Sequence, residues 1–212
     1  MAEALTIDVG QGRIGEAARA VAYSCFSRLF SYPTDAVRDW MVESAADELA
    51  WVAENLPYDS SLRVRRFPVL PASAEAIQAE YCRLFEVSRP RGTAVSLHEK
   101  DYVTCERGEV WEDILRFYEH FGLNYSRDDC QEFPDHLAVE LEFANYLSFL
   151  AAGAQGDCAA YERARADFVQ RHLSHFVSAL GEKLSGEGDA DLYGPFCAML
   201  RAFLSDEERT NA

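Results

Sequence analysis

Residues 132–143 read Glu-Phe-Pro-Asp-His-Leu-Ala-Val-Glu-Leu-Glu-Phe, and this stretch decides the fold. A proline at the first position of a helix loses no hydrogen bond, so Pro134 predicts a helix that begins there. Asp135 then lies where the helix dipole favours negative charge, and His136 and Glu140 share one face. The other side chains are almost all apolar, which is typical of a helix packed on most sides. The segment therefore predicts a buried helix with titratable groups at its N-terminus.

Apolar side chains recur at three- and four-residue steps through most of the chain, which predicts helices almost throughout. Thr34 and Ser73 are suitable capping residues, and Gly122 is placed to end a helix just after its last turn. The fold class that follows is all-α, a single globular bundle of about seven main helices. Their expected ranges are 18–29, 34–56, 73–85, 110–121, 134–152, 157–180 and 192–203.

The domain organisation is predicted to be simple. We expect one all-helical domain over residues 16–206, with a flexible N-terminal arm at 1–15 and a short tail at 207–212. Segment 87–106 has no helical stripe and contains a proline and a glycine, and long loops in compact domains are more often functional than not. Loops or hinges are expected at 57–72, 87–106 and 123–133.

The composition bounds the class of protein. Of the 212 residues, 49% are hydrophobic, which is enough for a substantial core. No apolar run approaches the roughly 20 residues that span a bilayer, and the N-terminus lacks the basic and apolar segments of a secretion signal. The six cysteines include no pair at metal-ligand spacing, and several fall on apolar helical faces. These features predict a reduced, cytoplasmic protein with no stable membrane association.

The net charge of −16 restricts the partners. Nucleic acid is excluded because its binding depends on neutralising phosphates with Lys and Arg. An anionic membrane surface is disfavoured for the same reason. The charge instead favours a cationic ligand, whose approach the field of the protein would accelerate. Solubility alone is the alternative explanation of the charge.

Searches for catalytic motifs give weak matches only. Residues 10–15 match the Gly-x-Gly-x-x-Gly fingerprint, but no strand–helix–strand unit surrounds them. No histidine has a glutamate three residues before it, as a di-metal carboxylate bundle requires. His172 and His175 are spaced to share a metal, although a solvated or hydrogen-bonded pair is the preferred interpretation. No phosphate-binding loop and no Gly-x-Ser-x-Gly elbow occurs, so no catalytic residue, resident metal or bound cofactor is predicted.

Residues 134–137 (Pro-Asp-His-Leu), followed by 140–143 (Glu-Leu-Glu-Phe), resemble the signature of the cytoplasmic chaperones that mature molybdenum enzymes, the TorD/DmsD/NarJ family. Two further segments occur upstream in the order that the family shows. They are 80–85 (Glu-Tyr-Cys-Arg-Leu-Phe) and the aromatic helix 111–121, closed by Gly-Leu. The similarity extends loosely over about residues 17–204, and its specific part is 134–143.

The resemblance implies a TorD-like fold and a non-enzymatic, client-specific chaperone. Such a protein would bind the twin-arginine signal peptide and the apo catalytic subunit of a DMSO-reductase-superfamily molybdoenzyme. It would assist insertion of the molybdenum cofactor and delay export until the client is mature. The identity of the client stays open, as do transient contact with molybdopterin or GTP and the choice between a monomer and a domain-swapped dimer.

In the family, the Asp-His pair belongs to the surface that receives the signal peptide. Guanidinium groups of a twin-arginine leader suit carboxylates, and its apolar part suits a groove lined by aromatic side chains. The alternative for Asp135 and His136 is a capping acid and a satisfied histidine, and the alternative for the aromatic residues is core packing. The candidate residues that bind the signal peptide are Glu132, Pro134, Asp135, His136 and Glu140, with Tyr81, Phe85, Trp111 and Tyr118 as groove walls, His98 and Tyr102 in the long loop, and Asp128 and Asp129 nearby.

Two other classes of protein stay open beside the chaperone. One is an unrecognised helical enzyme that depends on a metal or cofactor. The other is a structural adaptor that remains permanently in a mature complex. Bound metal or a chromophore would distinguish the enzyme, and presence in the mature complex would distinguish the adaptor.

Overall fold

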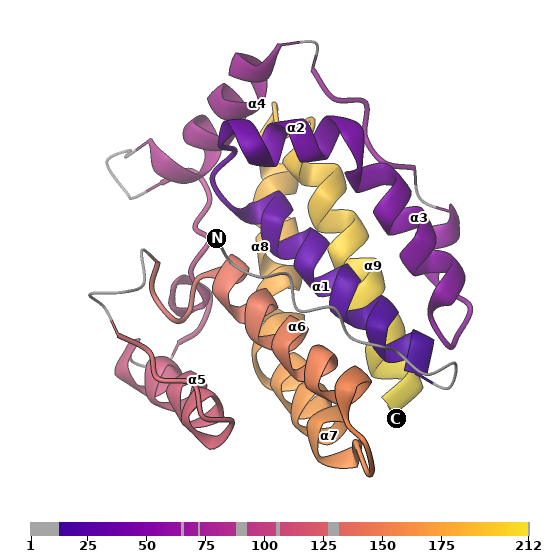
Figure 1. Ribbon diagram of the computed structural model, residues 1–212. Coiled ribbons are helices and arrows are strands. Elements are labelled where there is room, and N and C mark those ends of the chain that lie inside the picture. The colour runs from indigo at the N-terminus through magenta and orange to yellow at the C-terminus, as the bar shows by residue number, and fades with distance from the viewer. Residues whose placement is uncertain are drawn as a thin grey trace.

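The computed structural model describes residues 13–64, 66–71, 73–87, 93–104, 107–126 and 132–211, and these parts of the chain form an all-α bundle (Figure 1). The predicted fold class is therefore confirmed. The α-helices are α1 (Ile14–Phe30), α2 (Asp35–Glu43), α3 (Ala45–Asn55), α4 (Ala74–Tyr81), α5 (Arg107–His120), α6 (Leu137–Gly153), α7 (Ala159–Phe168), α8 (Ser174–Gly186) and α9 (Tyr193–Asn211). Short turns of other helix types are η2 (Ser61–Val64), η3 (Cys82–Glu86), η4 (Glu99–Asp101) and η5 (Val169–Leu173), of which η3 and η5 are π-helical.

Helices α1 and α6 form the centre of the bundle and pack along each other, with α3 and α9 also against α1 and α7 against α6. Small buried side chains on both helices, such as Ala22 in α1 and Ala144 in α6, allow a close approach. The hydroxyl of Ser27 donates to the carbonyl of Ala138 at 3.0 Å across this contact. Among the described helices, none combines the length and the apolar character needed to cross a membrane.

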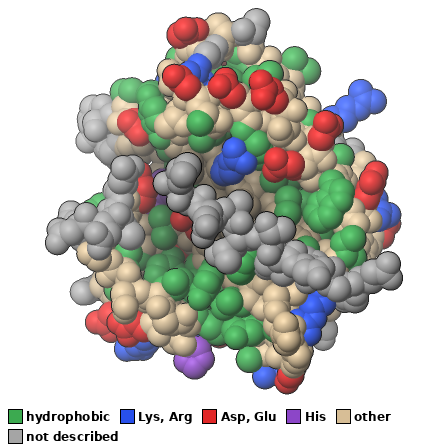
Figure 2. All heavy atoms as spheres, in the orientation of Figure 1, with side chains coloured by type: hydrophobic (Ala, Val, Ile, Leu, Met, Phe, Trp, Pro, Cys, Tyr) green, Lys and Arg blue, Asp and Glu red, His purple; other side chains and the backbone are tan. Residues whose placement is uncertain are grey.

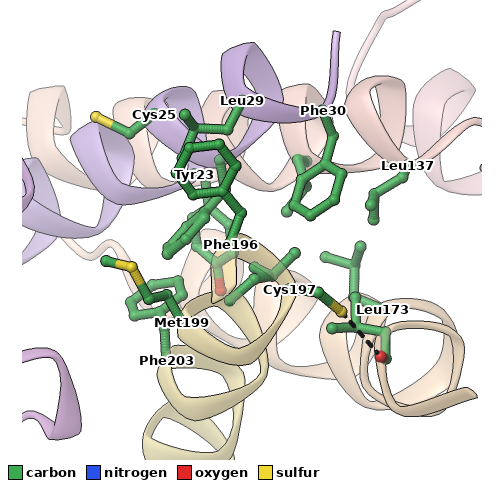
Figure 3. Close-up of a cluster of buried hydrophobic side chains, with 14 of the residues drawn as sticks. Tyr23, Cys25, Leu29, Phe30, Leu137, Leu173, Phe196, Cys197, Met199 and Phe203 are labelled. Atoms are coloured by element: carbon green, nitrogen blue, oxygen red, sulfur yellow. Dashed lines mark hydrogen bonds between the residues drawn. The ribbon is translucent and has the colours of Figure 1, made fainter. Parts of the chain in front are cut away.

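Aromatic side chains fill the space between α1 and α9. Figure 3 shows Tyr23 and Phe30 of α1 facing Phe196 and Phe203 of α9. The rings of Tyr23 and Phe203 meet edge-on with centroids 5.0 Å apart, and all four side chains are fully buried. Each such burial contributes about 2 kcal/mol, so the two ends of the sequence are held together by hydrophobic packing.

Several sequence-predicted boundaries are confirmed, and others are wrong. Thr34 and Ser73 accept the capping hydrogen bonds of α2 and α4, and Gly122 adopts the positive φ of 76° expected after α5. The helix expected over 34–56 is instead two helices, because Ser44 leaves the helical conformation with φ −136°. Helix α9 continues to Asn211, so residue 206 is not a domain boundary.

The N-terminal arm was expected to end at residue 15, but α1 already begins at Ile14. Residues 1–12 lie outside the described part of the chain. The arginine that precedes α1, Arg13, reaches the end of α6, where its guanidinium donates to the carbonyl of Ala151 at 3.0 Å. The first described residues are therefore attached to the bundle.

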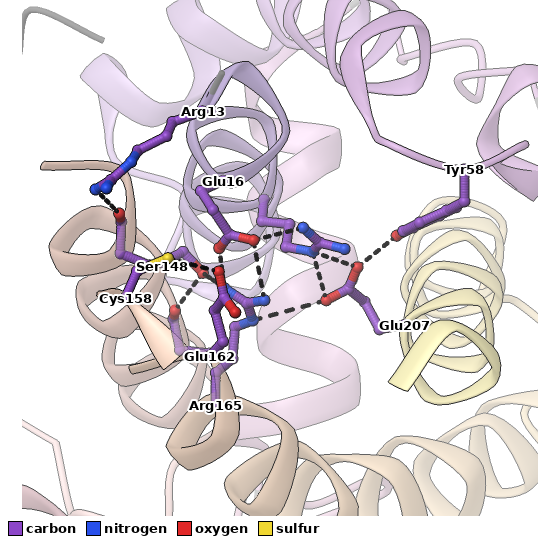
Figure 4. Close-up of polar contacts among 11 residues, drawn as sticks. Arg13, Glu16, Tyr58, Ser148, Cys158, Glu162, Arg165 and Glu207 are labelled. Carbon is purple, nitrogen blue, oxygen red and sulfur yellow. Dashed lines mark hydrogen bonds and ion pairs between the residues drawn. The ribbon is translucent and has the colours of Figure 1, made fainter. Parts of the chain in front are cut away.

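A buried ionic network joins α1, α7 and α9 at the end of the bundle (Figure 4). Arg19 donates to Glu207 at 2.8 Å and to Glu16 at 2.6 Å, and Arg165 contacts both of these carboxylates. The hydroxyl of Tyr58 adds a hydrogen bond to Glu207 at 2.6 Å. Burial alone would lower the pKa of Arg19, but Glu207 and Glu16 outweigh it and raise the pKa. Each charge in this network depends on its partners, because burying an unpaired ion costs several kcal/mol.

Replacing Glu207 by Gln keeps the shape of the side chain and removes the charge that Arg19 and Arg165 share. We expect the free energy of unfolding to fall by about 3 kcal/mol, because both arginines then lie buried without full compensation. Urea denaturation followed by circular dichroism measures the loss. The control is Glu208→Gln at the neighbouring exposed position, which should stay within about 0.5 kcal/mol of the wild type. Equal losses in the two variants would contradict this role of the network.

Candidate functional site

The predicted site lies where the loop 93–104 returns to the start of α6. The N–H of Leu137 donates to the carbonyl of Leu97 at 2.9 Å, and the N–H of Glu99 donates to the carbonyl of Asp135 at 2.9 Å. These bonds form an isolated antiparallel bridge between His98 and His136. A segment that has no helical pattern of its own is thus fixed to the bundle through backbone groups.

Helix α6 begins at Leu137, so the prediction that Pro134 occupies its first position is wrong. Residues 133–136 form a turn, in which the N–H of His136 donates to the carbonyl of Phe133 at 3.0 Å. His136 is the capping residue, and its Nδ1 accepts the N–H of Ala138 at 3.2 Å. Burial lowers the pKa of His136 to about 3, so the ring is neutral and able to accept this bond.

Asp135 is completely buried and points into the returning loop. One carboxylate oxygen lies 3.4 Å from Nδ1 of His98, and the other lies 3.4 Å from the backbone nitrogen of Lys100. Burial alone would raise the pKa of Asp135, but the hydrogen bonds from His98 and Trp111 outweigh it and hold the pKa below its ordinary value. The carboxylate is therefore a charged group that organises the loop and α5 around itself.

A second buried carboxylate, Glu99, binds two histidines from the other side of the bundle. Its oxygens lie 3.0 Å from Nδ1 of His172 and 2.9 Å from Nε2 of His175. The remaining nitrogen of His172 lies 3.1 Å from Asp113 on α5. Burial would raise the pKa of Glu99, but the two histidines hold it below its ordinary value. Sequence reasoning missed Glu99 as the partner of His172 and His175.

No group of three or more His, Cys, Asp or Glu side chains that could hold a metal ion is present within the described ranges. His172 and His175 both contact the carboxylate of Glu99, which agrees with the hydrogen-bonded one of the two alternatives preferred from their spacing.

Glu140 lies on the first turn of α6 and is fully buried. Burial, together with the neighbouring charges of Glu99 and Asp135, raises its pKa well above the ordinary value. Glu140 therefore keeps its proton to a higher pH than an exposed glutamate does. Beside it, the buried hydroxyl of Tyr118 donates to the carbonyl of Pro134 at 3.1 Å, which ties α5 to the turn before α6.

Much of the predicted binding surface is therefore interior. Asp135, His136 and Glu140 are sealed from solvent, so their prediction as direct contacts of a peptide is not met in this conformation. They are buried because the loop 93–104 pairs with the backbone at the N-terminus of α6 and covers it. Tyr102, expected on a surface loop, is partly buried, and its ring lies 5.3 Å from that of Phe176. Also buried are Pro134 and the predicted groove walls Tyr81, Phe85 and Tyr118.

The aromatic residues form two packed groups. Tyr81, Phe85 and Tyr193 meet edge-on at centroid distances of 5.1 to 5.7 Å, which is the core packing that the sequence left as the alternative. Trp111 is half-buried and stacks on Phe133 at 5.0 Å. The acids Asp128 and Asp129 lie outside the described residues.

An accessible acidic and apolar patch remains beside these groups, and we call it the acidic corner. The side chains of Glu132 and Glu86 are exposed. Partial burial raises the pKa of Glu132, His98 opposes this shift, and the nearby charge of Glu86 adds to it. Both carboxylates also raise the pKa of Tyr81, which burial raises most. In the view of Figure 2, further acidic side chains lie over the upper part of the molecule, where Figure 1 places α2, α3 and α4. The acidic corner consists of Tyr32, Glu86, Val87, Glu132 and Phe133.

Of the predicted candidates that the structure describes, only Glu132 belongs to the acidic corner with its side chain exposed. Sequence reasoning missed Tyr32, which is 44% exposed with its ring 5.6 Å from Tyr81, and Val87, which is 53% exposed. Glu86 was missed as well, although it directly follows the quoted segment 80–85.

Several known proteins are similar to this chain in sequence. The family model described as nitrate reductase delta subunit matches residues 64–181. The selenate reductase assembly chaperone protein of Thauera selenatis is 34% identical over 184 residues, covering 84% of this chain and 83% of that protein. The chlorate reductase assembly chaperone protein of Ideonella dechloratans is 32% identical over 184 residues, with the same coverage.

A crystal structure of a putative redox enzyme maturation protein from Archaeoglobus fulgidus has the same fold. It superposes with a TM-score of 0.55 at 20% identity, over 96% of this chain and 99% of that one. The chain belongs to the nitrate reductase delta subunit family, which contains assembly chaperones of redox enzymes and not catalysts. The resemblance drawn from residues 134–143 is confirmed at this level.

The raised pKa of Glu140 makes stability depend on pH. The unfolded side chain loses its proton near pH 4.5 and the folded one at higher pH, so the native state binds more protons in between and stability falls as pH rises. Glu140→Gln is neutral at every pH and removes this contribution. We expect the variant to gain stability over the wild type by up to about 1.4 kcal/mol per pH unit within the window above 4.5.

Urea denaturation at several values between about pH 5 and 8 measures this difference. The control is Glu119→Gln at an exposed position of α5, whose curve should run parallel to that of the wild type. A parallel curve for Glu140→Gln as well would mean that Glu140 is ionised in the folded protein.

Proposed function

We propose that this chain binds the twin-arginine leader of the apo catalytic subunit of a molybdoenzyme. It would hold that subunit until the molybdenum cofactor is inserted, and so delay export. The relatives named as assembly chaperones of selenate and chlorate reductases support the general role. The observation that carries the leader-binding role is the acidic corner, where two exposed carboxylates lie beside exposed apolar side chains.

The chemistry of the acidic corner suits a basic segment followed by an apolar one. Glu86 and Glu132 repel each other, so a guanidinium group placed between them would relieve the repulsion and form charge-assisted hydrogen bonds. Tyr32 and Val87 offer apolar surface for the part of the leader that follows its arginines. The charge of −16 would accelerate the encounter with a cationic peptide, and salt would weaken it.

The buried Asp-His pair would act on the leader indirectly. Asp135 and His136 fix the turn that carries Glu132 and Phe133, through contacts with the loop 93–104 and α5. Lys100 lies 5.9 Å over the ring of Phe133, so the same loop also holds this ring in place. In this proposal Asp135 and His136 are positioning residues for the acidic corner, and the mechanism is binding and release without chemistry.

The test compares two synthetic peptides, one with adjacent arginines followed by an apolar helix-forming segment and one with glutamine in place of the arginines. We expect the arginine peptide to bind the wild type, and Glu86→Gln/Glu132→Gln to weaken this binding by about tenfold or more, because the loss of paired carboxylates costs about 1.4 kcal/mol or more. Isothermal titration calorimetry measures both affinities.

The control variant is Asp47→Asn/Glu182→Gln, which changes the net charge equally at two exposed positions away from the acidic corner. Its affinity should match that of the wild type at moderate salt. Equal binding of the two peptides would falsify the electrostatic part of the proposal. Recovery of the chain as a subunit of the mature enzyme would instead favour the permanent adaptor.

A further inference from the structure

A groove of about 720 Å³ lies between α5 and α7, away from the acidic corner. Its apolar lining comes from Phe117 and Phe121 on one side and from Ala160 and Ala164 on the other. Phe117 packs edge-on against Phe168 of the core at 5.2 Å, yet it is only half-buried. Figure 1 shows α5 beside the α6–α7 pair. The groove is lined by side chains of α5 and α7.

The rim of this groove carries positive charge in a strongly acidic protein. Its two aspartates, Asp113 and Asp167, both lie near Arg171, at 2.5 Å and 3.5 Å, so this arginine compensates them. Arg116 and Arg163 complete the charged rim, and both are exposed. The contact of Arg116 with Glu112 is a solvent-exposed pair at 3.4 Å, with side chains 73% and 72% exposed. Such pairs contribute only about 0.3–0.5 kcal/mol, so Arg116 can readily exchange its partner.

We propose that this α5 groove, lined by Phe117, Phe121, Ala160 and Ala164 and flanked by Arg116 and Arg163, docks an acidic amphipathic helix of a partner protein. The two alanines are one turn apart and leave room for a helix to approach α7 closely. Apolar side chains of the partner would cover the two phenylalanine rings, in the helix-in-groove mode of recognition. Its carboxylates would bind Arg116 and Arg163, because guanidinium groups favour bidentate contacts with carboxylates.

The sign of the charge separates this surface from the acidic corner. A basic leader is attracted by Glu86 and Glu132 and repelled by Arg116 and Arg163, whereas an acidic helix has the opposite preference. A client that carries both elements would be held at two points, and the second contact would form at a high effective concentration. Docking of the acidic helix does not depend on leader binding, so each can fail without the other.

The probe is a synthetic helical peptide of about 14 residues, roughly four turns, with leucines along one face and glutamates flanking them. A copy with glutamine in place of every glutamate serves as the matched peptide, because a basic copy would itself be attracted to the acidic corner. We expect the acidic peptide to bind the full-length protein and the glutamine copy to bind at least tenfold more weakly. Fluorescence anisotropy of labelled peptides measures both affinities.

The variant Arg116→Gln/Arg163→Gln should lose at least tenfold in affinity for the acidic peptide. Lys183→Gln/Arg201→Gln removes two exposed cations from α8 and α9 and should bind as the wild type does. Ala160→Trp fills the groove from an exposed position and should block the acidic peptide without changing the melting temperature. All of these variants should bind the arginine leader peptide with unchanged affinity.

Three results would overturn the inference. One is equal binding of the acidic peptide and its glutamine copy, which would show unspecific apolar contact. Another is an unchanged affinity of the groove variants for the acidic peptide, with the leader still bound at the acidic corner. The third is self-association of the wild type that Arg116→Gln/Arg163→Gln abolishes, because a second copy of this chain would then be the occupant.

Discussion

The buried carboxylate of Asp135 is the constraint on which this end of the molecule depends. A charged group that is fully sealed from water costs several kcal/mol unless its neighbours compensate it. The compensation comes from His98 in the loop 93–104 and from Trp111 on α5, so both elements have to be in place for α6 to begin where it does. The exposed Glu132 and the half-buried Phe133 lie within three residues before Asp135, so the buried contacts of Asp135 help to set their position.

The local part of this architecture was predictable from the sequence, and the long-range part was not. Helix periodicity and the caps at Thr34 and Ser73 depend on neighbouring residues, which the sequence shows directly. The start of α6 was misplaced because a proline suits the first position of a helix and a preceding turn equally well. What decides between them is the pairing of Leu137 with Leu97, forty residues earlier, and no local pattern encodes this contact.

The same difference between local and long-range information explains which parts of the candidate site were predictable. Residues 134–143 identified the family and placed the candidate site at the N-terminal end of α6. They could not show which side chains face solvent. Glu99 read as an ordinary polar residue and Glu140 as a candidate contact of a peptide, whereas the fold encloses them near His172, Asp135 and each other. Conversely, Tyr32 and Glu86 carry no motif. Their significance comes from exposure beside Glu132, which is a product of packing.

The π-helical turn η5 has a consequence for how much length variation this chain can tolerate. It accommodates one more residue than an α-helical turn between α7 and α8, and it contains both Arg171 and His172. Deleting a single position from a regular α-helix rotates everything downstream by about 100°. In η5 the π-helical turn can instead become an α-helical one, so α8 keeps its packing against α9, provided that Arg171 and His172 are retained to contact Asp113. A one-residue gap in an alignment of relatives is therefore expected at η5 more readily than within α7 or α8.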